Sequence, residues 1–138
     1  MRDDKCIFCK IIAGEIPSNT IYEDDDFKAM LDIDPATKGH TLIIPKNHYA
    51  NLMELDDEAA SKALLVAKKI ATKMMGSLGC DGINMAQNNG IVAGQTVNHF
   101  HIHLIPRYKN DKDKTICGWS HQSFTADEMA EIKNTLSF

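Results

Sequence analysis

Three histidines alternate with apolar residues in one short stretch of this chain. His99, His101 and His103 are each separated by a single apolar residue. Alternation with a period of two is typical of a β-strand, in which successive side chains leave opposite faces. We therefore predict a strand over residues 97–105 that presents three imidazoles on one face and apolar side chains on the other. Imidazoles titrate near neutral pH, so such a row suits chemistry better than it suits packing.

Two kinds of chemistry fit this row of histidines. One is a metal site, because neutral imidazoles are good zinc ligands. On a straight strand, however, the roots of the outer two rings would lie roughly 13–14 Å apart, which is too far for all three to converge easily on one ion. The other is nucleophilic catalysis, in which a ring nitrogen attacks an electrophile and forms a covalent intermediate. His101 is the favoured nucleophile because it alone has a titratable neighbour on both sides. A solvent-facing strand that happens to be rich in histidine is the remaining alternative.

A glycine-rich segment, residues 88–96, leads directly into the histidine row. Gly90 and Gly94 permit a positive φ and a close approach of the backbone, which are features of an anion-binding loop. The alternative for Asn88-Asn89-Gly90 is a plain turn.

Cys6 and Cys9 supply half of the ligands of a tetrahedral zinc site at the usual spacing. The chain has no second Cys-x-x-Cys pair, so any further ligands must come from distant residues. The alternative is that both cysteines are small buried hydrophobic residues on a short helix. Cys80 and Cys117 belong to no motif, and this pattern is typical of cytosolic thiols rather than of a disulfide framework.

The elements that must position these residues follow from apolar periodicity and from helix-breaking residues. We predict strands over residues 21–23, 27–32, 39–45, 82–87 and 97–105. A short helix is expected over residues 6–13, a long helix over about 56–77, and a C-terminal helix that opens with a capping box at Thr125. The apolar stripe of the long helix is predicted to consist of Ala60, Ala63, Leu64, Ala67, Ile70, Ala71, Met74 and Met75.

These elements predict one α+β domain that spans residues 1–138. Its core would be a five-stranded, mostly antiparallel sheet with one long helix packed across a face and short N- and C-terminal helices. A chain of 138 residues is long enough to bury a core without disulfides.

Composition excludes several classes of function. The net charge of −4 argues against a broad electrostatic surface for nucleic acid or for an anionic membrane, although a small phosphorylated ligand remains compatible with it. The first residues lack the apolar region of a secretory signal. No run approaches the roughly eighteen apolar residues that a membrane helix needs. We therefore expect a cytoplasmic protein with no membrane or nucleic-acid partner.

Residues 99–105 match the pattern His-φ-His-φ-His-φ-φ, where φ is apolar, and the chain resembles the histidine triad (HIT) family of nucleotide hydrolases and transferases. Residues 31–35, 39–46 and 88–96 are also similar to that family, and the similarity runs from about residue 6 to residue 108. It is greatest to the bacterial Hint-like branch and not to the diadenosine triphosphate hydrolases. The resemblance implies a HIT-like fold and a homodimer whose sheets join.

The resemblance also implies a two-step nucleotidyl transfer. His101 would attack the α-phosphorus of a purine nucleoside phosphoramidate, an acyl phosphate or a similar mixed phosphate, and water would then release the nucleoside monophosphate, such as AMP or GMP. Asp32 would accept from the ribose hydroxyls and Ile33 would line the base pocket. His40 would lie close to the phosphate, either as a catalytic residue or as a satisfied histidine behind it. The donors to the phosphoryl oxygens would be His103, Asn88, Thr96 and backbone amides around Gly94 and Gln95.

Zinc-containing members of the wider superfamily combine such a cysteine pair with a histidine after the third strand and with the first histidine of the triad. The resemblance therefore implies a closed structural zinc site made of Cys6, Cys9, His48 and His99. His99 would then be a metal ligand and not a proton carrier.

Two other functions remain open at this point. A dinucleoside polyphosphate hydrolase would differ mainly in its leaving group, and a non-catalytic nucleotide-binding or interaction module would keep only the fold. The presence of the whole triad together with Asn88 and Thr96 argues against the second. In the family the C-terminal segment often contributes to substrate selection, so Trp119 and His121 are candidates there. The alternative for Trp119 is a packing residue.

Overall fold

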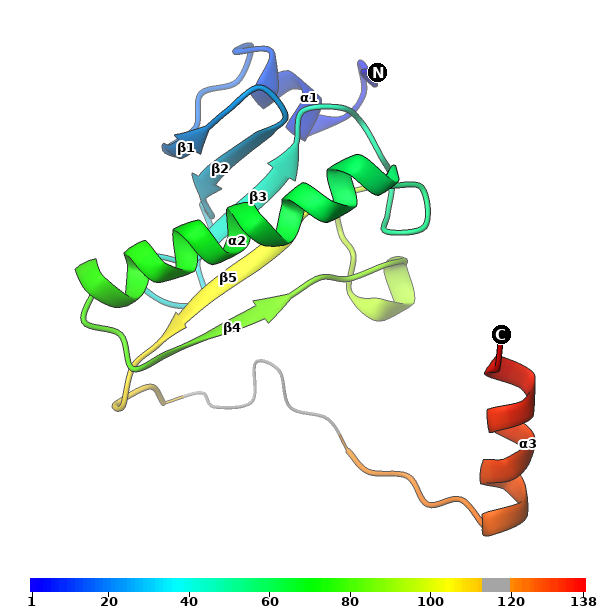
Figure 1. Cartoon of the computed structure of the whole chain (residues 1–138). Helices are drawn as coiled ribbons and strands as arrows, with labels where there is room; N and C mark the ends of the chain where they lie inside the picture. Colours follow the sequence, from blue (N-terminus) through cyan, green and yellow to red (C-terminus); the bar gives the residue numbers. More distant parts are fainter. Residues whose placement is uncertain (113–119) are drawn as a thin grey trace.

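The computed structural model describes residues 1–112 and 120–138, and a five-stranded antiparallel sheet organises them (Figure 1). The strands are β1 (Thr20–Glu23), β2 (Phe27–Leu31), β3 (Thr41–Pro45), β4 (Gly82–Ala86) and β5 (Ile102–Arg107). Their spatial order is β1-β2-β3-β5-β4, and every pairing between neighbours is antiparallel. The predicted α+β fold is confirmed.

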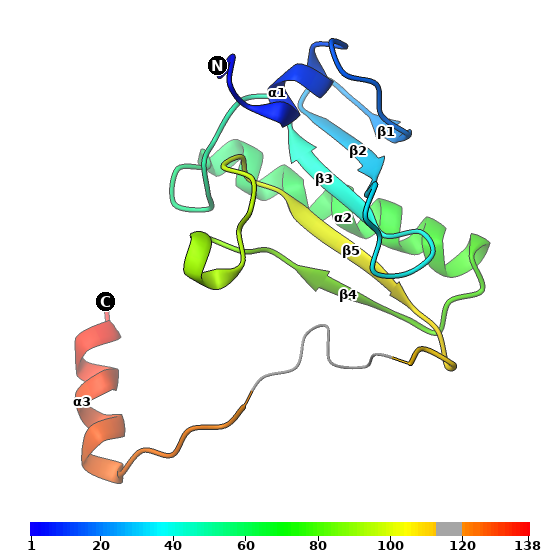
Figure 2. The same ribbon diagram turned by 180° about the vertical axis from the view of Figure 1, so that it is seen from behind.

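Three α-helices and one 3₁₀ turn accompany the sheet in the described part of the chain. They are α1 (Ile7–Ile12), α2 (Asp57–Ser77), η1 (Ile91–Ala93) and α3 (Ala126–Leu136). Helix α2 runs across one face of the sheet, and α1 and the connecting loops are seen from the other side (Figure 2). No helix among the described residues is long and apolar enough to span a membrane.

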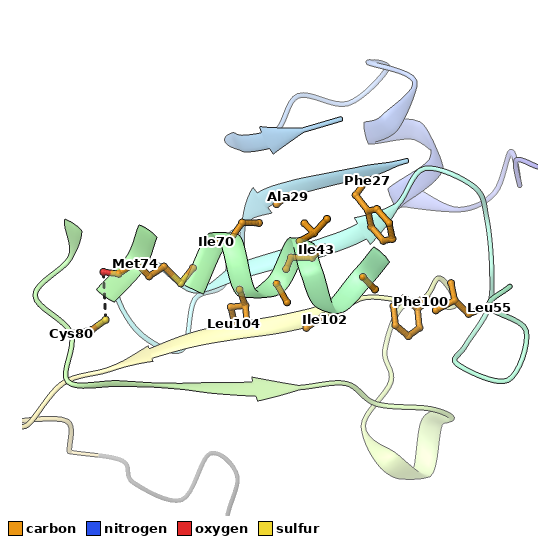
Figure 3. Packing of buried hydrophobic residues seen from close by; sticks show 13 residues of the cluster. Phe27, Ala29, Ile43, Leu55, Ile70, Met74, Cys80, Phe100, Ile102 and Leu104 are labelled. Carbon is orange, nitrogen blue, oxygen red and sulfur yellow. Dashed lines mark hydrogen bonds between the residues drawn. The ribbon is translucent and has the colours of Figure 1, made fainter. Parts of the chain in front are cut away.

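Alternation along the inner strands divides their side chains between two cores. Ala29 and Ile43 belong to the core beneath α2, whereas Met30 and Leu42 belong to a second core that includes residues of α1. Successive strand residues face opposite sides of a sheet, so one short sequence contributes to both cores. The core beneath α2 also receives Phe100, Ile102 and Leu104 (Figure 3).

The strand of the histidine row begins later than predicted. We expected a strand over residues 97–105, but β5 begins at Ile102, where its ladder with β3 starts opposite Ile43. Before that point the backbone pairs with a loop, because the amide of Phe100 donates to the carbonyl of Tyr49 over 2.6 Å. The other predicted strand ends differ by one or two residues.

The long helix has the predicted bounds but a narrower apolar stripe. Asp56 caps it by accepting from the amide of Ala59. The buried residues of α2 are Ala63, Val66, Ala67, Ile70 and Met74. Ala60, Leu64 and Met75 are exposed, contrary to prediction, while Val66 was missed. Spacing of three and four residues selects a single stripe facing the sheet, and Val66 lies on that stripe.

The C-terminal helix has the predicted start and buries none of its residues. The hydroxyl of Thr125 accepts from the amide of Glu128, and the Glu128 carboxylate accepts from the amide of Thr125, so the predicted capping box is confirmed. Helix α3 lies away from the sheet (Figure 1). His121 is exposed, and Trp119 lies outside the described residues.

Candidate active site and metal centre

The three histidines of the row face the side of the sheet opposite α2. The ring of Phe8, in α1, lies edge-on to His99 at 5.8 Å and to His101 at 5.3 Å between ring centres. The rings of His101 and His103 are 4.9 Å apart. The common face that alternation predicts is thus present, although two of the three histidines precede the strand itself.

A backbone carbonyl determines which nitrogen of His101 carries the proton. The Nδ1–H of His101 donates to the carbonyl of His99 over 2.7 Å. A carbonyl can only accept, so in the neutral ring Nε2 holds a free lone pair. His101 is 5 % exposed, and its partner belongs to the main chain, so the ring orientation is well defined.

Two successive hydrogen bonds determine which ring nitrogen of His103 carries the proton. The amide of Ala36 donates to Nδ1 of His40 over 3.0 Å, so Nε2 must carry the proton in neutral His40. That Nε2 lies 2.9 Å from Nδ1 of His103, which therefore accepts. The remaining nitrogen of His103, Nε2, is then a donor.

Burial keeps these rings neutral at physiological pH. It lowers the pKa of His99 to about 4, against the opposing hydrogen bond to a carbonyl. Burial, together with the neighbouring His101 and His40, lowers the pKa of His103 to about 4. The pKa values of His101 and His40 are also lowered by burial, although the carboxylate of Asp32 opposes this. Neutral imidazoles can act as nucleophiles, donors or metal ligands.

The predicted ribose and base contacts lie at the end of β2. Asp32 Oδ2 lies 3.5 Å from Nε2 of His40, and its side chain is 17 % exposed. Its other oxygen accepts from the amide of Asp34 over 2.9 Å. Ile33 is 93 % exposed, so its side chain is free to contact a ligand. The carboxylate is thus beside the histidines, whereas the apolar residue projects into solvent.

The glycine-rich loop has the backbone conformation that its sequence predicts. Gly90 has a φ of +92° and Gly94 a φ of +93°. The backbone amides, however, are used within the loop. The amide of Gly94 donates to the carbonyl of Ile91 over 3.0 Å, and that of Gln95 donates to the carbonyl of Gly90 over 3.1 Å. In this arrangement the two amides we expected to bind phosphate already have partners.

The side chain of Gln95 holds the loop together. It is 6 % exposed, its oxygen accepts from the amide of Gly90, and its nitrogen donates to the carbonyls of Ala50 and Val97. All of its hydrogen-bonding groups are therefore engaged. Gln95 shapes the loop and has no free donor for a ligand.

The side chains of Asn88 and Thr96 remain available as donors beside this loop. Asn88 Nδ2 donates to the carbonyl of Gly94 over 3.5 Å, which is a long bond that leaves its second hydrogen free. Thr96 is exposed.

Four side chains that are distant in sequence converge at the other end of the histidine row. The Sγ atoms of Cys6 and Cys9 and ring nitrogens of His48 and His99 all lie within 4.8 Å of one another. His99 Nδ1 is 3.4 Å from the sulfur of Cys6, 3.7 Å from that of Cys9 and 3.2 Å from Nδ1 of His48. Tetrahedral bonds of about 2.0 Å to nitrogen and 2.3 Å to sulfur imply ligand separations of roughly 3.3–3.8 Å. The donor set therefore fits zinc in both chemistry and size.

The surroundings of these four residues also favour a metal. The Nε2–H of His99 donates to the carbonyl of Pro45 over 2.9 Å, which leaves Nδ1 unprotonated and directed at the cluster. The amides of Asp3 and Cys9 donate to the sulfurs of Cys9 and Cys6, each over 3.5 Å. Such bonds stabilise thiolates, the form in which cysteine binds metal.

A second group of possible metal ligands is less suitable. Asp32, His40 and His103 also bring one ligand atom each within 4.8 Å. The nitrogen of His40 that faces this group carries a proton, however, because the amide of Ala36 occupies the other nitrogen. A metal would need that proton to move to a nitrogen that faces an N–H donor. The geometry therefore favours hydrogen bonding over metal binding here.

The structure adds groups that sequence reasoning missed. Phe8 contacts two triad histidines, and its position between the two cysteines was the available signal. The carbonyl of Pro45 and the amide of Ala36 determine which ring nitrogens of His99 and His40 are protonated. Backbone groups carry no residue-type signal, so sequence offered no means of finding them.

Comparison with known proteins gives consistent matches. The family model for the HIT domain matches residues 13–110. An adenosine 5'-monophosphoramidase of Saccharomyces cerevisiae is 42% identical over 97% of this chain and 82% of its own length. The crystal structure of a HIT family member from Bacillus subtilis is 41% identical with a TM-score of 0.89, covering 97% of this chain and 96% of that one. A zinc-bound histidine triad family protein from Mycobacterium smegmatis is 35% identical with a TM-score of 0.75, covering 95% and 97% of the two chains.

Proposed function

Because the chain belongs to the histidine triad (HIT) family, we propose that it hydrolyses purine nucleoside phosphoramidates, or related mixed phosphates, through a nucleotidyl intermediate on His101. The observation that carries this proposal is the free Nε2 lone pair of a buried, neutral His101 beside a donor on His103. A relative named as an adenosine 5'-monophosphoramidase supports the substrate class.

The reaction divides into two displacements at phosphorus. In the first, Nε2 of His101 forms a bond to the α-phosphorus while the bond from phosphorus to the leaving amine breaks. The departing nitrogen takes a proton from water, and Nε2–H of the neutral His103 donates a hydrogen bond that stabilises the negative charge developing on that nitrogen. In the second, water attacks the phosphorus, the P–N bond to His101 breaks, and the proton of that water neutralises the hydroxide left by the first step.

The remaining residues bind and orient the nucleotide. Charge spreads over the phosphoryl oxygens in the transition state, so donors aimed at them contribute most of the catalysis. Asn88 and Thr96 are the proposed side-chain donors, and Gly94 and Gln95 maintain the loop that carries them. Asp32 accepts from the ribose, and Ile33 covers the base.

The test uses adenosine phosphoramidate as substrate and the His101→Ala variant. The wild type releases AMP, whereas the variant loses turnover yet still binds AMP in a calorimetric titration. Rapid quenching of the wild type should yield a protein species heavier by one nucleotidyl group. His121→Ala is the matched control, because it removes an exposed histidine outside the site and should keep full turnover.

The same assay separates the alternatives. Full turnover by His101→Ala would exclude His101 as the nucleophile. Hydrolysis of diadenosine polyphosphates but not of phosphoramidates would identify a dinucleoside polyphosphate hydrolase. Nucleotide binding without turnover of either substrate would identify a binding module.

We further propose that Cys6, Cys9, His48 and His99 hold a structural zinc ion. When bound, zinc would hold the ring of His99 and the first turn of α1 in place through four closed ligands, with no step of the transfer passing through it. Support comes from the tetrahedral separations of the four ligand atoms and from the protonation of His99.

Metal analysis of protein purified without a chelator tests the zinc proposal. One zinc per chain is expected in the wild type and much less in Cys6→Ser. Cys80→Ser is the matched control, since Cys80 is also a buried thiol but lies outside the cluster. A wild type without zinc would contradict the proposal.

We also propose a homodimer whose sheets join along β4. This strand is at an edge of the sheet, and exposed edges are usually covered or paired. Apolar side chains lie beside it: Leu52, Leu64 and Met85 are each at least 50% exposed. Leu52, Leu64 and Met85 line a common hollow of about 240 Å³ between α2 and the sheet.

We place the protein in a reducing compartment such as the cytoplasm, since its described cysteines are free thiols.

A further inference from the structure

Helix α3 is amphipathic, yet its apolar side is uncovered. Met129, Ile132 and Leu136 recur at helical spacing and are 54%, 40% and 69% exposed. Glu128 and Glu131 lie along one side of this stripe. An isolated helix of 11 residues has only marginal stability in water, so we expect the apolar side of α3 to pack on another surface.

A matching groove lies across the sheet from the histidines. It is a hollow of about 900 Å³ between the C-terminal half of α2 and strands β1 to β3. Apolar side chains form most of it, among them Ile21, Leu31 and Leu78. Ile21 and Leu31 are 49% and 37% exposed, so the groove is open to a partner.

The charges of the groove and of the helix are complementary. Lys38, Lys69 and Lys73 border the groove, and no Asp or Glu is among the described residues that line it. Lys69 Nζ lies 5.0 Å from the centre of the Tyr22 ring, which holds that ammonium at the border. Lys69 and Lys73 are one turn apart on α2, as are Glu128 and Glu131 on α3, so two parallel ion pairs can form.

The arrangement of the chain indicates which copy supplies the helix. In Figure 1, α3 lies beyond the β4 edge, toward the end of the molecule opposite the C-terminal end of α2. In the proposed dimer, a two-fold axis runs through β4 perpendicular to the sheet. Rotation about this axis places the C-terminal end of α2 of the second copy, together with the groove beside it, on the side where α3 of the first copy lies.

We propose that α3 docks into the groove between α2 and strands β1 to β3 of a second copy of this chain, with Met129, Ile132 and Leu136 toward its apolar floor. By symmetry the two copies exchange helices, which adds a second contact to the pairing of the β4 edges. The inference rests on the proposed homodimer and is independent of the proposed hydrolytic activity.

Isotope-resolved cross-linking tests this docking on the full-length protein. Unlabelled and ¹⁵N-labelled chains are mixed, allowed to exchange subunits, and treated with a carbodiimide that joins carboxylates to amines. We expect cross-links from Glu128 or Glu131 of one isotopic copy to Lys69 or Lys73 of the other. Cross-links confined to one isotope would mean that α3 binds its own chain, and their absence would mean that α3 is not in the groove; either result overturns the proposal.

Two sets of variants separate docking from incidental proximity. Ile132→Glu keeps both reactive carboxylates but disrupts the apolar side, and it should reduce the cross-links at least tenfold. The double variant Lys69→Glu, Lys73→Glu should reduce helix docking, which would be measured as faster proteolysis of α3. Adding the reverse changes, Glu128→Lys and Glu131→Lys, should restore the resistance of α3 to proteolysis. Lys68→Glu, one position outside the groove, is the matched control and should change nothing.

Light scattering distinguishes failure of docking from failure of the dimer. A dimeric wild type that lacks these cross-links would overturn helix exchange and leave the β4 pairing intact. A monomeric wild type would overturn both. Turnover of adenosine phosphoramidate, measured on the same samples, reports separately on the proposed hydrolysis.

Discussion

Each histidine of the triad has a different partner for its proton. His101 donates from Nδ1 to a carbonyl, His99 donates from Nε2 to another carbonyl, and His103 accepts from His40. Three chemically identical side chains thereby differ: His101 has a free lone pair at Nε2, His99 has a free lone pair at Nδ1, and His103 has a donor at Nε2. A nucleophile, a metal ligand and a hydrogen-bond donor are the roles that these states favour.

The donor role of His103 predicts a dependence on the leaving group. His103→Ala should lower kcat at least about a hundredfold for a phosphoramidate of an alkylamine, because negative charge develops on that nitrogen as it leaves and the variant has no hydrogen bond to stabilise it. A nitrophenyl ester of the same nucleotide has a leaving group that carries its own charge readily, so the loss should be less than about tenfold. Steady-state kinetics on both substrates measures the difference. Equal losses would contradict a hydrogen bond from His103 to the leaving group.

Burial of His103 predicts a loss of stability at acidic pH. Its pKa is about 4 in the folded chain and about 6.5 when unfolded, so the unfolded state binds more protons between these values. Stability is therefore complete above about pH 6.5 and falls as the pH drops toward 4. From pH 7 to pH 5 this residue should cost about 2 kcal/mol of unfolding free energy. Urea titrations at pH 7 and pH 5 should show a smaller difference in unfolding free energy for His103→Gln than for the wild type. His121→Gln, which replaces an exposed histidine, should show the same difference as the wild type.

At the scale of the elements, short segments hold the site in place because they are attached at several points. Helix α1 has only six residues, too few to be stable alone, but Phe8 and Ile11 are buried against the sheet and Cys6 caps its start. The turn before β3 is similarly constrained, since Gly39 adopts a φ of +90° immediately before His40. Each segment positions one of the histidine-bearing stretches.

Two glycine substitutions should have opposite effects on stability. In Gly39→Ala the new Cβ would lie 2.5 Å from Cδ1 of Leu78 at a φ that side chains avoid, so we expect a loss of about 1–3 kcal/mol. Gly76 lies within α2 with open space around it, and Gly76→Ala should stabilise by about 0.5–1 kcal/mol through helix propensity. Urea midpoints of the two variants provide the comparison. A stable Gly39→Ala would show that this turn tolerates another conformation.

For the whole molecule, the distribution of exposed apolar side chains is informative. One set surrounds the free edge of β4, and another lies on α3, far from it along the chain. A third set, Ile33, Ile91 and Val92, is exposed on the loops that precede His40 and His99. The proposed dimer would use the first two sets, whereas the third borders the proposed active site.

The proposed dimer predicts the effect of charge on neighbouring leucines of α2. Leu64→Glu places a carboxylate in the hollow beside Met85 and should reduce the mass in solution from two chains to one. Leu65 is similarly exposed, at 67%, but lines a different hollow, so Leu65→Glu should leave the mass unchanged. Light scattering at several protein concentrations measures both. Equal behaviour of the two variants would contradict the β4 interface.

Local patterns of the sequence predicted much of the fold. Alternation identified the common face of the histidines, spacing of three and four identified α2, and Thr125 with Glu128 identified the start of α3. These features depend on residues close in the chain. The errors occurred where distant groups compete, as when Tyr49 takes the amide of Phe100 and delays the start of β5.

The sequence by itself identified the histidine row, the cysteine pair and the loop glycines, because these features depend only on residue type and spacing. Their resemblance to a family supplied the four-ligand set, which spacing could not, since 93 residues separate Cys6 from His99. Only the tertiary structure decided which nitrogen of each ring is free. That choice depends on main-chain groups, such as the carbonyl of Pro45 and the amide of Ala36, whose directions are determined by the fold and not by any side chain.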